Sequence, residues 1–123
     1  MTEEKLNHYR DLLLRMRQDT QAKEEHYRNR LEENPADYES GNKFAFHIAD
    51  EGTEGMEREK ESMMYAREER TLREIDAALD RVEKGDYGKC ENCGKQISDE
   101  RLESVPVTTL CAECINKINP PQV

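Results

Sequence analysis

The sequence has little of what fills a globular core. None of its 123 residues is tryptophan, 6% are aromatic and 34% are hydrophobic, whereas 38% carry a charge. So few apolar side chains do not fill a broad core, but they suffice to line a narrow seam between helices. A disordered chain has a similar composition, but the apolar residues of this one are regularly spaced. The composition therefore favours an elongated helical protein with a small stapled module.

Two further absences concern partners and location. No apolar run approaches the roughly 20 residues of a membrane span, and the first residues, MTEEKLNHYR, lack the apolar core of a secretory signal. The net charge is −9, so phosphate backbones and anionic membranes repel the chain on average. We therefore expect a cytoplasmic protein with no membrane partner and no sequence-specific DNA binding. In that compartment thiols stay reduced, and clustered cysteines favour a metal over disulfides.

Glycine and proline are sparse, and their positions divide the chain. Residues 2–33 contain neither, and Thr2 at their start suits the N-cap position of a helix. The segment NPADYESGN, residues 34–42, is dense in helix breakers. A second helical run begins near residue 50 and continues to residue 84, where Gly85 provides a C-terminal stop. The pattern predicts two long helices joined by an irregular segment.

The apolar residues of both helices follow the 3–4 spacing of a coiled coil. These residues are Leu6, Tyr9, Leu13 and Met16 in the first helix, and Leu72, Ile75, Leu79 and Val82 in the second. When the two sets are paired in reverse order, the residue numbers of every pair have the same sum, as in an antiparallel hairpin. Extending this register places polar residues in the seam: Thr20 opposite Glu68, Lys23 opposite Tyr65, and Tyr27 opposite Glu61. We expect the seam to be apolar at its base and polar toward the turn.

All four cysteines lie within residues 88–114, as Cys90-x-x-Cys93 and Cys111-x-x-Cys114 with 17 residues between the pairs. This spacing is typical of structural zinc sites, because each C-x-x-C forms a tight turn with both sulfurs on one side. A thioredoxin-like pair would need a βαβ pattern, which is not apparent, and polar flanks favour zinc over an iron–sulfur cluster. Four thiolates saturate a tetrahedral ion, so we expect one structural Zn²⁺.

The predicted fold is therefore mainly α. Residues 1–84 form a long antiparallel coiled-coil hairpin with its tip near 34–52, residues 85–118 form a small zinc-finger module with four cysteine ligands, and residues 119–123 form a short tail.

The segment GDYGKCENCGKQISDERLESVPVTTLCAEC, residues 85–114, resembles the signature of the DksA/TraR C4-type zinc-finger family. That signature reads G-x-Y-G-x-C-x-x-C-G-x-x-I, followed by R-L, P and C-x-x-C. The run ADEGTE with a following EREK resembles the YteA-like branch of the family. The resemblance implies a regulator that binds RNA polymerase and inserts its hairpin through the secondary channel, where acidic tip residues act near the catalytic magnesium. Guanosine tetraphosphate cooperates with some members and is a candidate partner here.

The resemblance also implies which residues of the tip to consider. The family pattern at the start of the second helix is Asp-x-x-Asp-x-Ala; Asp50 matches the second Asp, whereas His47 and Gly52 stand at the first Asp and the Ala positions. Glu51 and Glu54 add acidic groups beside Asp50. Asp50 has an ordinary alternative as a helix N-cap, and the two glutamates suit the positive end of a helix.

Arg101, in DERLESVP, is a candidate contact to polymerase by the same resemblance, with pairing to local acidic neighbours as the alternative. The alternative function for the whole chain is a zinc-stapled adaptor between proteins without transcriptional activity. An enzyme is not expected, because no nucleophile–base pair, open metal site or phosphate-binding glycine loop is apparent.

Overall fold

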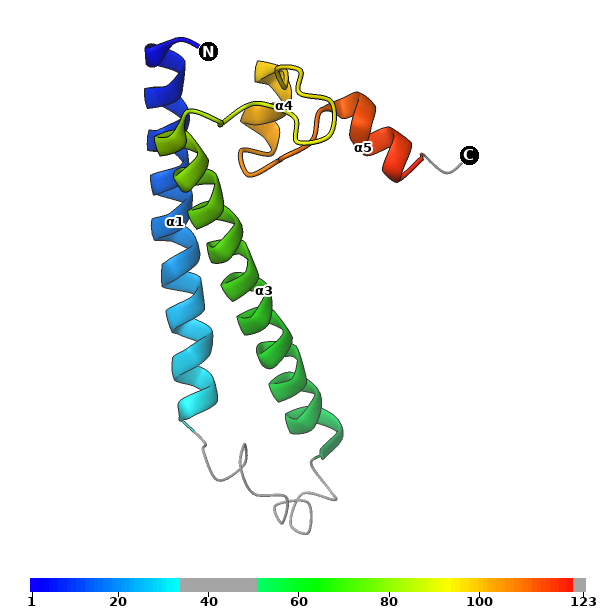
Figure 1. Cartoon of the computed structure of the whole chain (residues 1–123). Coiled ribbons are helices and arrows are strands. Elements are labelled where there is room, and N and C mark those ends of the chain that lie inside the picture. The colour runs from blue at the N-terminus through cyan, green and yellow to red at the C-terminus, as the bar shows by residue number, and fades with distance from the viewer. Residues whose placement is uncertain (34–50, 121–123) are drawn as a thin grey trace. The chain divides into compact units, whose positions relative to one another are not determined.

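The computed structural model describes residues 1–33 and 51–120, and for residues 51–54 the backbone only. The described part of the chain is helical, with a single isolated antiparallel bridge between Lys89 and Gln96 in place of strands (Figure 1). Its helices are α1 (Glu3–Glu32), α3 (Glu51–Lys84), α4 (Asp99–Ser104) and α5 (Ala112–Ile118). The predicted fold class, mainly α with a long helical pair and a cysteine-rich C-terminal module, is confirmed. None of the helices in these ranges combines the length and apolar character that crossing a membrane requires.

The ends of the long helices follow from local chemistry. Thr2 caps α1, because its Oγ1 accepts a hydrogen bond from the backbone N–H of Lys5 at 3.2 Å. At the end of α3, Gly85 has a φ of +81°, a left-handed conformation that costs glycine little. The N–H of Asp86 then reaches back to the carbonyl of Arg81 at 2.9 Å and closes the last turn. Both predicted helix boundaries are confirmed.

The chain divides into two units, Met1–Arg17 with Arg73–Val123, and Gln18–Leu72. We call them the base unit and the distal unit. Each contains part of α1 and part of α3.

The core of the base unit joins the hairpin to the finger. Its buried side chains come from both parts: Tyr9, Leu13, Ile75, Ala78 and Val82 from the long helices, and Tyr87, Cys90, Ile97, Leu102 and Cys114 from the segment that follows. Leu6, Met16 and Leu79 pack against this core, so the apolar seam predicted for this unit is confirmed. The rings of Tyr9 and Tyr87 lie 5.6 Å apart and link α1 to the start of the finger.

The seam of the distal unit is polar. Thr20, Glu24 and Glu68 are buried, with 8%, 8% and 7% of their surface exposed. The prediction for Thr20 and Glu68 is confirmed, but the prediction that Lys23 lies in the seam is wrong: Lys23 is exposed and Glu24 is buried instead. A step of four residues from Thr20 to Glu24 follows the 3.6-residue helical turn over this stretch better than a step of three to Lys23. It also leaves the strongly hydrated lysine ammonium in water.

Ion pairs and hydrogen bonds along the distal unit show its antiparallel pairing. Arg30 binds Glu61 at 2.7 Å, and Arg58 Nη2 donates to the carbonyl of Leu31 at 3.5 Å, so later residues of α1 meet earlier residues of α3. Burial, followed by the nearby carboxylates of Glu69 and Glu24, raises the pKa of Tyr65. In this unit, polar and aromatic contacts thus take the place of the apolar seam found in the base unit.

Candidate metal centre

The first cysteine pair sits in a tight loop shaped by two glycines. Gly88 and Gly94 have φ values of +85° and +77°, so both adopt the left-handed conformation. The N–H of Gly94 donates to the carbonyl of Cys90 at 2.9 Å and closes the loop. A Cβ on Gly88 would lie 2.5 Å from Met1 Cε and 2.8 Å from Gln96 Nε2, so a larger residue there displaces both. The local sequence therefore fixes the direction of the Cys90 and Cys93 side chains.

The second pair sits at the start of α5. Cys111 is the N-cap residue of that helix, and Cys114 lies in its first turn, so the two sulfurs lie at the same helix end. The N–H of Glu91 donates to the carbonyl of Thr109 at 2.8 Å, which holds the first loop against the segment leading to the second. The C-x-x-C spacing thus produces a turn in one case and a helix start in the other.

The four sulfurs converge. The Sγ atoms of Cys90, Cys93, Cys111 and Cys114 all lie within 4.8 Å of one another. Cys93 Sγ and Cys111 Sγ are 3.7 Å apart. A disulfide needs about 2.05 Å, whereas four thiolates around a tetrahedral ion with Zn–S bonds of about 2.3 Å lie about 3.8 Å from one another. The residues present therefore fit a tetrahedral Zn²⁺ ion.

The surroundings of the sulfurs shift the pKa values of two of the thiols in opposite directions. The pKa of the Cys90 thiol is lowered to about 6, chiefly because the backbone amide of Cys111 hydrogen-bonds to it, with that of Cys93 next. Asn92 Nδ2 donates to Cys114 Sγ at 3.3 Å, an outer contact of the kind that orients metal ligands. Asn92 lowers the pKa of Cys114, but Cys111, burial and the other cysteines raise it to about 11 overall. Cys90 and Cys114 therefore ionise over different pH ranges in the absence of a cation, and a bound divalent ion would stabilise both thiolates.

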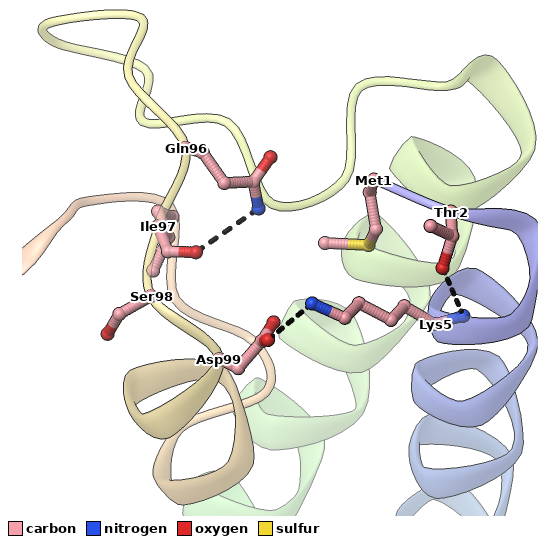
Figure 2. A pocket seen from close by; sticks show the side chains of 7 residues that line it. All are labelled: Met1, Thr2, Lys5, Gln96, Ile97, Ser98 and Asp99. Carbon is pink, nitrogen blue, oxygen red and sulfur yellow. Dashed lines mark hydrogen bonds and ion pairs between the residues drawn. The ribbon is translucent and has the colours of Figure 1, made fainter.

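A second cluster of polar contacts joins the first turns of α1 to α4 within the base unit. Lys5 Nζ and Asp99 Oδ2 are 2.6 Å apart, and both groups line a groove of about 620 Å³ together with Met1, Thr2, Gln96, Ile97 and Ser98 (Figure 2). Tyr9 Oη donates to Asp99 Oδ1 at 3.2 Å. One turn along each helix, His8 Nε2 lies 2.5 Å from Glu103 Oε1.

Sequence reasoning missed this cluster, since charged residues outside the seam pattern carry no signal of a long-range partner. The one available signal was Tyr9, whose hydroxyl needs a polar partner when its ring is buried.

The predicted partner-binding residues are not gathered at this centre. His47 and Asp50 lie outside the described residues, and Glu51 and Glu54 fall in the first turn of α3, where only the backbone is described. Arg101 lies in α4, with Nε donating to the carbonyl of Leu110 at 2.8 Å and Nη2 to Thr108 Oγ1 at 3.2 Å. Its guanidinium therefore holds the segment that leads to Cys111. The roles of all five residues in partner binding stay predictions.

Comparison with known proteins shows which family has this arrangement of cysteines. A family model described as "Prokaryotic dksA/traR C4-type zinc finger" matches residues 85–119. The uncharacterized protein YteA of Bacillus subtilis is 45% identical over 67 residues, which are 54% of this chain and 28% of that protein. The RNA polymerase-binding transcription factor DksA of Escherichia coli is 42% identical over 48 residues, 39% of this chain and 32% of that protein. The matched segments thus span about a third of these curated relatives or less.

A solved structure extends the likeness to nearly the whole chain. Transcription factor DksA2 from Pseudomonas aeruginosa is 34% identical and superposes with a TM-score of 0.78, covering 94% of this chain and 84% of that one. Its likeness includes the long helices as well as the cysteine module. The chain therefore belongs to the DksA/TraR family of C4-type zinc-finger proteins.

Proposed function

We propose that this chain is a transcription regulator that binds RNA polymerase and inserts the tip of its helical hairpin into the secondary channel. The observation that carries the proposal is the likeness to DksA2, which extends over both the hairpin and the finger at 34% identity. The name of the Escherichia coli relative as an RNA polymerase-binding transcription factor supports the same partner. Polymerase is cytoplasmic in bacteria, so the proposal also assigns that location.

The metal part of the proposal is one structural Zn²⁺ held by Cys90, Cys93, Cys111 and Cys114. Their sulfurs already lie at distances suited to a tetrahedral ion, and four protein ligands leave no position for a substrate. The ion would stabilise the finger, whose helices have only 6 and 7 residues, through binding energy. The proposed role is therefore binding without catalysis.

The first test is binding to purified core RNA polymerase, measured with the fluorescently labelled chain. Saturable binding that Escherichia coli DksA competes away is the expected result, because both proteins would enter the same channel. Absence of binding at micromolar polymerase, with the zinc-loaded and folded chain, contradicts the proposal.

The second test concerns the tip. Asp50→Asn should leave polymerase affinity within about twofold but remove any change in promoter-complex lifetime, because the acidic group would act near the catalytic magnesium rather than in binding. Glu59→Gln, an exposed change on α3, is the matched control. If Asp50→Asn instead lowers the melting temperature and leaves the lifetime effect intact, Asp50 is a helix cap. Adding guanosine tetraphosphate to the same assay tests the alarmone as a further partner.

The replacement of two of the three tip-pattern residues, by His47 and Gly52, keeps a second function under consideration. This is an adaptor that joins other proteins without an effect on transcription. A pull-down from lysate that enriches an unrelated protein, with no polymerase subunit, would favour the adaptor.

A further inference from the structure

Each cysteine pair contributes one buried and one accessible sulfur to the candidate metal centre. Cys90 and Cys114 are buried, with 3% and 2% of their surface exposed, whereas Cys93 is exposed and Cys111 is half-buried. The two accessible sulfurs are neighbours, since the Sγ atoms of Cys93 and Cys111 lie 3.7 Å apart. We call Cys93 and Cys111 the outer edge of the centre. One side of the sulfur cluster is therefore covered by protein, and the outer edge is open to solvent.

The two buried sulfurs are also held by hydrogen bonds. Cys90 Sγ accepts hydrogen bonds from the backbone amides of Cys111 and Cys93. Cys114 Sγ accepts one from Asn92 Nδ2 at 3.3 Å. Contacts of this kind fix the orientation of a metal ligand. Because Cys90 and Cys114 are part of the close-packed base core, an external molecule reaches the outer edge first.

The loop of the first cysteine pair carries two cations near the outer edge. Lys89 and Lys95 flank the loop; both are exposed, and neither forms an ion pair with the side chains that the structure describes. Lys95 is two residues from Cys93, so its backbone lies within about 7 Å of that residue, less than the Debye length in physiological salt. Four thiolates around Zn²⁺ carry a charge of about −2, which repels an anion. The two lysines offset this repulsion and attract an anionic ligand.

We infer that a small anionic thiol binds the metal at the outer edge by displacing Cys93, and that zinc exchange follows this route. The class of ligand follows from the site: a thiolate replaces a thiolate on the ion, and carboxylates on the same molecule are attracted by Lys89 and Lys95. The step is a ligand exchange without oxidation or reduction. The external thiol loses its proton and forms the new Zn–S bond, the bond from Cys93 to the ion breaks, and Cys93 takes up a proton. The buried ligands hold the ion until Cys111 is exchanged in the same way.

This inference rests on the zinc part of the proposed function, so the experiment begins there. The full chain is loaded with Co²⁺, which binds the same kinds of ligand as Zn²⁺ and whose visible absorption distinguishes four sulfur ligands from three. Wild type should show the four-sulfur spectrum.

The decisive variant is Cys93→Ala, probed with mercaptosuccinate, a thiol with two carboxylates. Cys93→Ala should lose the four-sulfur spectrum, and mercaptosuccinate should restore it, because the vacated position is open to solvent. Cys114→Ala is the matched control: it also lacks one sulfur, but its position is buried, so mercaptosuccinate should not restore the spectrum.

The wild-type protein provides a second measurement, the rate of zinc release to a chromogenic chelator. The rate should rise in proportion to the concentration of mercaptosuccinate, since the thiol takes part in the exchange. K89Q/K95Q should lower this slope by about threefold or more, because it removes both cations beside the outer edge. K23Q/K60Q makes the same change in net charge at exposed positions of the distal unit, and its slope should stay within about 1.5-fold of wild type.

Each result has a defined consequence. If wild type shows no four-sulfur spectrum, the zinc part of the proposed function fails, and this inference fails with it. If wild type shows the spectrum but mercaptosuccinate restores it in neither variant, or equally in both, the inference alone is overturned. If neither variant binds Co²⁺, the release rate decides: a rate independent of thiol concentration overturns the route through Cys93. Equal slopes for the two lysine variants overturn the choice of an anionic thiol.

Discussion

Arg101 is the residue whose environment most changes its interpretation. The resemblance to the family made it a candidate contact to polymerase, yet its guanidinium donates to the Leu110 carbonyl and to Thr108 Oγ1. Thr108 Oγ1 in turn donates to the same carbonyl at 3.0 Å, so the Leu110 carbonyl accepts hydrogen bonds from both Arg101 and Thr108. Arg101 thus connects α4 to the segment just before Cys111, and its first role is to shape the finger.

We predict that Arg101→Ala lowers the stability of the zinc-loaded protein by about 1–3 kcal/mol, because it leaves partly buried acceptors without a charged donor. Arg101→Lys should recover less than half of the loss, since an ammonium lacks the planar fork of guanidinium. Urea unfolding followed by circular dichroism measures both. If Arg101→Ala leaves stability unchanged but weakens polymerase binding, Arg101 contacts polymerase rather than shaping the finger.

Among the secondary-structure elements, α1 and α4 are coupled through a buried phenol. Tyr9 is buried in the base core and donates to Asp99, while Lys5 pairs with the same carboxylate. Burial, with Asp99 next, raises the pKa of Tyr9 from 10.0 to about 12. The side chain of Lys5, by donating to Asp99, lowers the pKa of that carboxyl.

This coupling predicts a loss of stability in alkali. Below pH 10 both states keep the Tyr9 proton; between pH 10 and about 12 the unfolded chain releases it while the folded chain keeps it, so stability falls as pH rises through this window. Tyr9 should contribute about 1–2 kcal/mol to this loss, so the loss should be smaller by that amount in Tyr9→Phe. A remainder should persist, because burial also raises the pKa of Tyr87. Urea midpoints at about pH 9 and about pH 11 measure it. Tyr27→Phe, a change in the distal unit, should keep the full loss; an equal loss in Tyr9→Phe would contradict the assignment.

The polar seam of the distal unit gives a second prediction for the long helices. Glu68 is buried, and the described residues give its carboxylate no hydrogen bond or ion pair, so its burial costs free energy. Glu68→Leu should raise stability by about 1–3 kcal/mol through restored apolar contact. Glu59→Leu, an exposed position of the same helix, should change stability by less than about 0.5 kcal/mol. A lower urea midpoint for Glu68→Leu in a monomeric sample would show that the carboxylate has a stabilising partner.

The helices and the cysteine cluster were predictable from sequence because local rules govern them. Thr2 and Gly85 mark helix ends through capping, Cys90 begins a tight C-x-x-C loop, and Cys111 begins a C-x-x-C pair at a helix start. Lys23 was misplaced because a strict 3–4 alternation does not reveal where a helix of 3.6 residues per turn takes two steps of four. The contacts of Tyr9 and Arg101 depend on residues distant in sequence, and no periodic pattern announces them.

At the scale of the whole molecule, binding of one Zn²⁺ ion should determine whether the finger is folded. The finger helices have 6 and 7 residues, against 30 and 34 in α1 and α3. Cys111→Ser should weaken Zn²⁺ binding by more than about a hundredfold, since even changes to outer contacts cost 10- to 100-fold. The finger should then unfold with little loss of helical circular dichroism, while Tyr87, Ile97 and Leu102 leave the base core and the melting temperature falls.

Zinc content by mass spectrometry of the intact protein, with amide exchange of the finger, measures this outcome. Asn92→Ala, which removes only the donor to Cys114 Sγ, should cost about tenfold in affinity and keep the fold. Unchanged zinc stoichiometry in Cys111→Ser would contradict the four-ligand assignment.

The contacts of Lys5 with Asp99 and of His8 with Glu103, which join α1 to α4, bear on how the protein folds during synthesis. Lys5 and His8 contact residues 94 and 95 positions later in the chain. A ribosome therefore releases the apolar face of α1, including Tyr9 and Leu13, well before its partners in α3 and the finger have been synthesised. Lys5 and His8 of α1 must wait for partners that are synthesised 94 and 95 positions later, so the nascent chain packs α1 in its native way only after the finger has been translated.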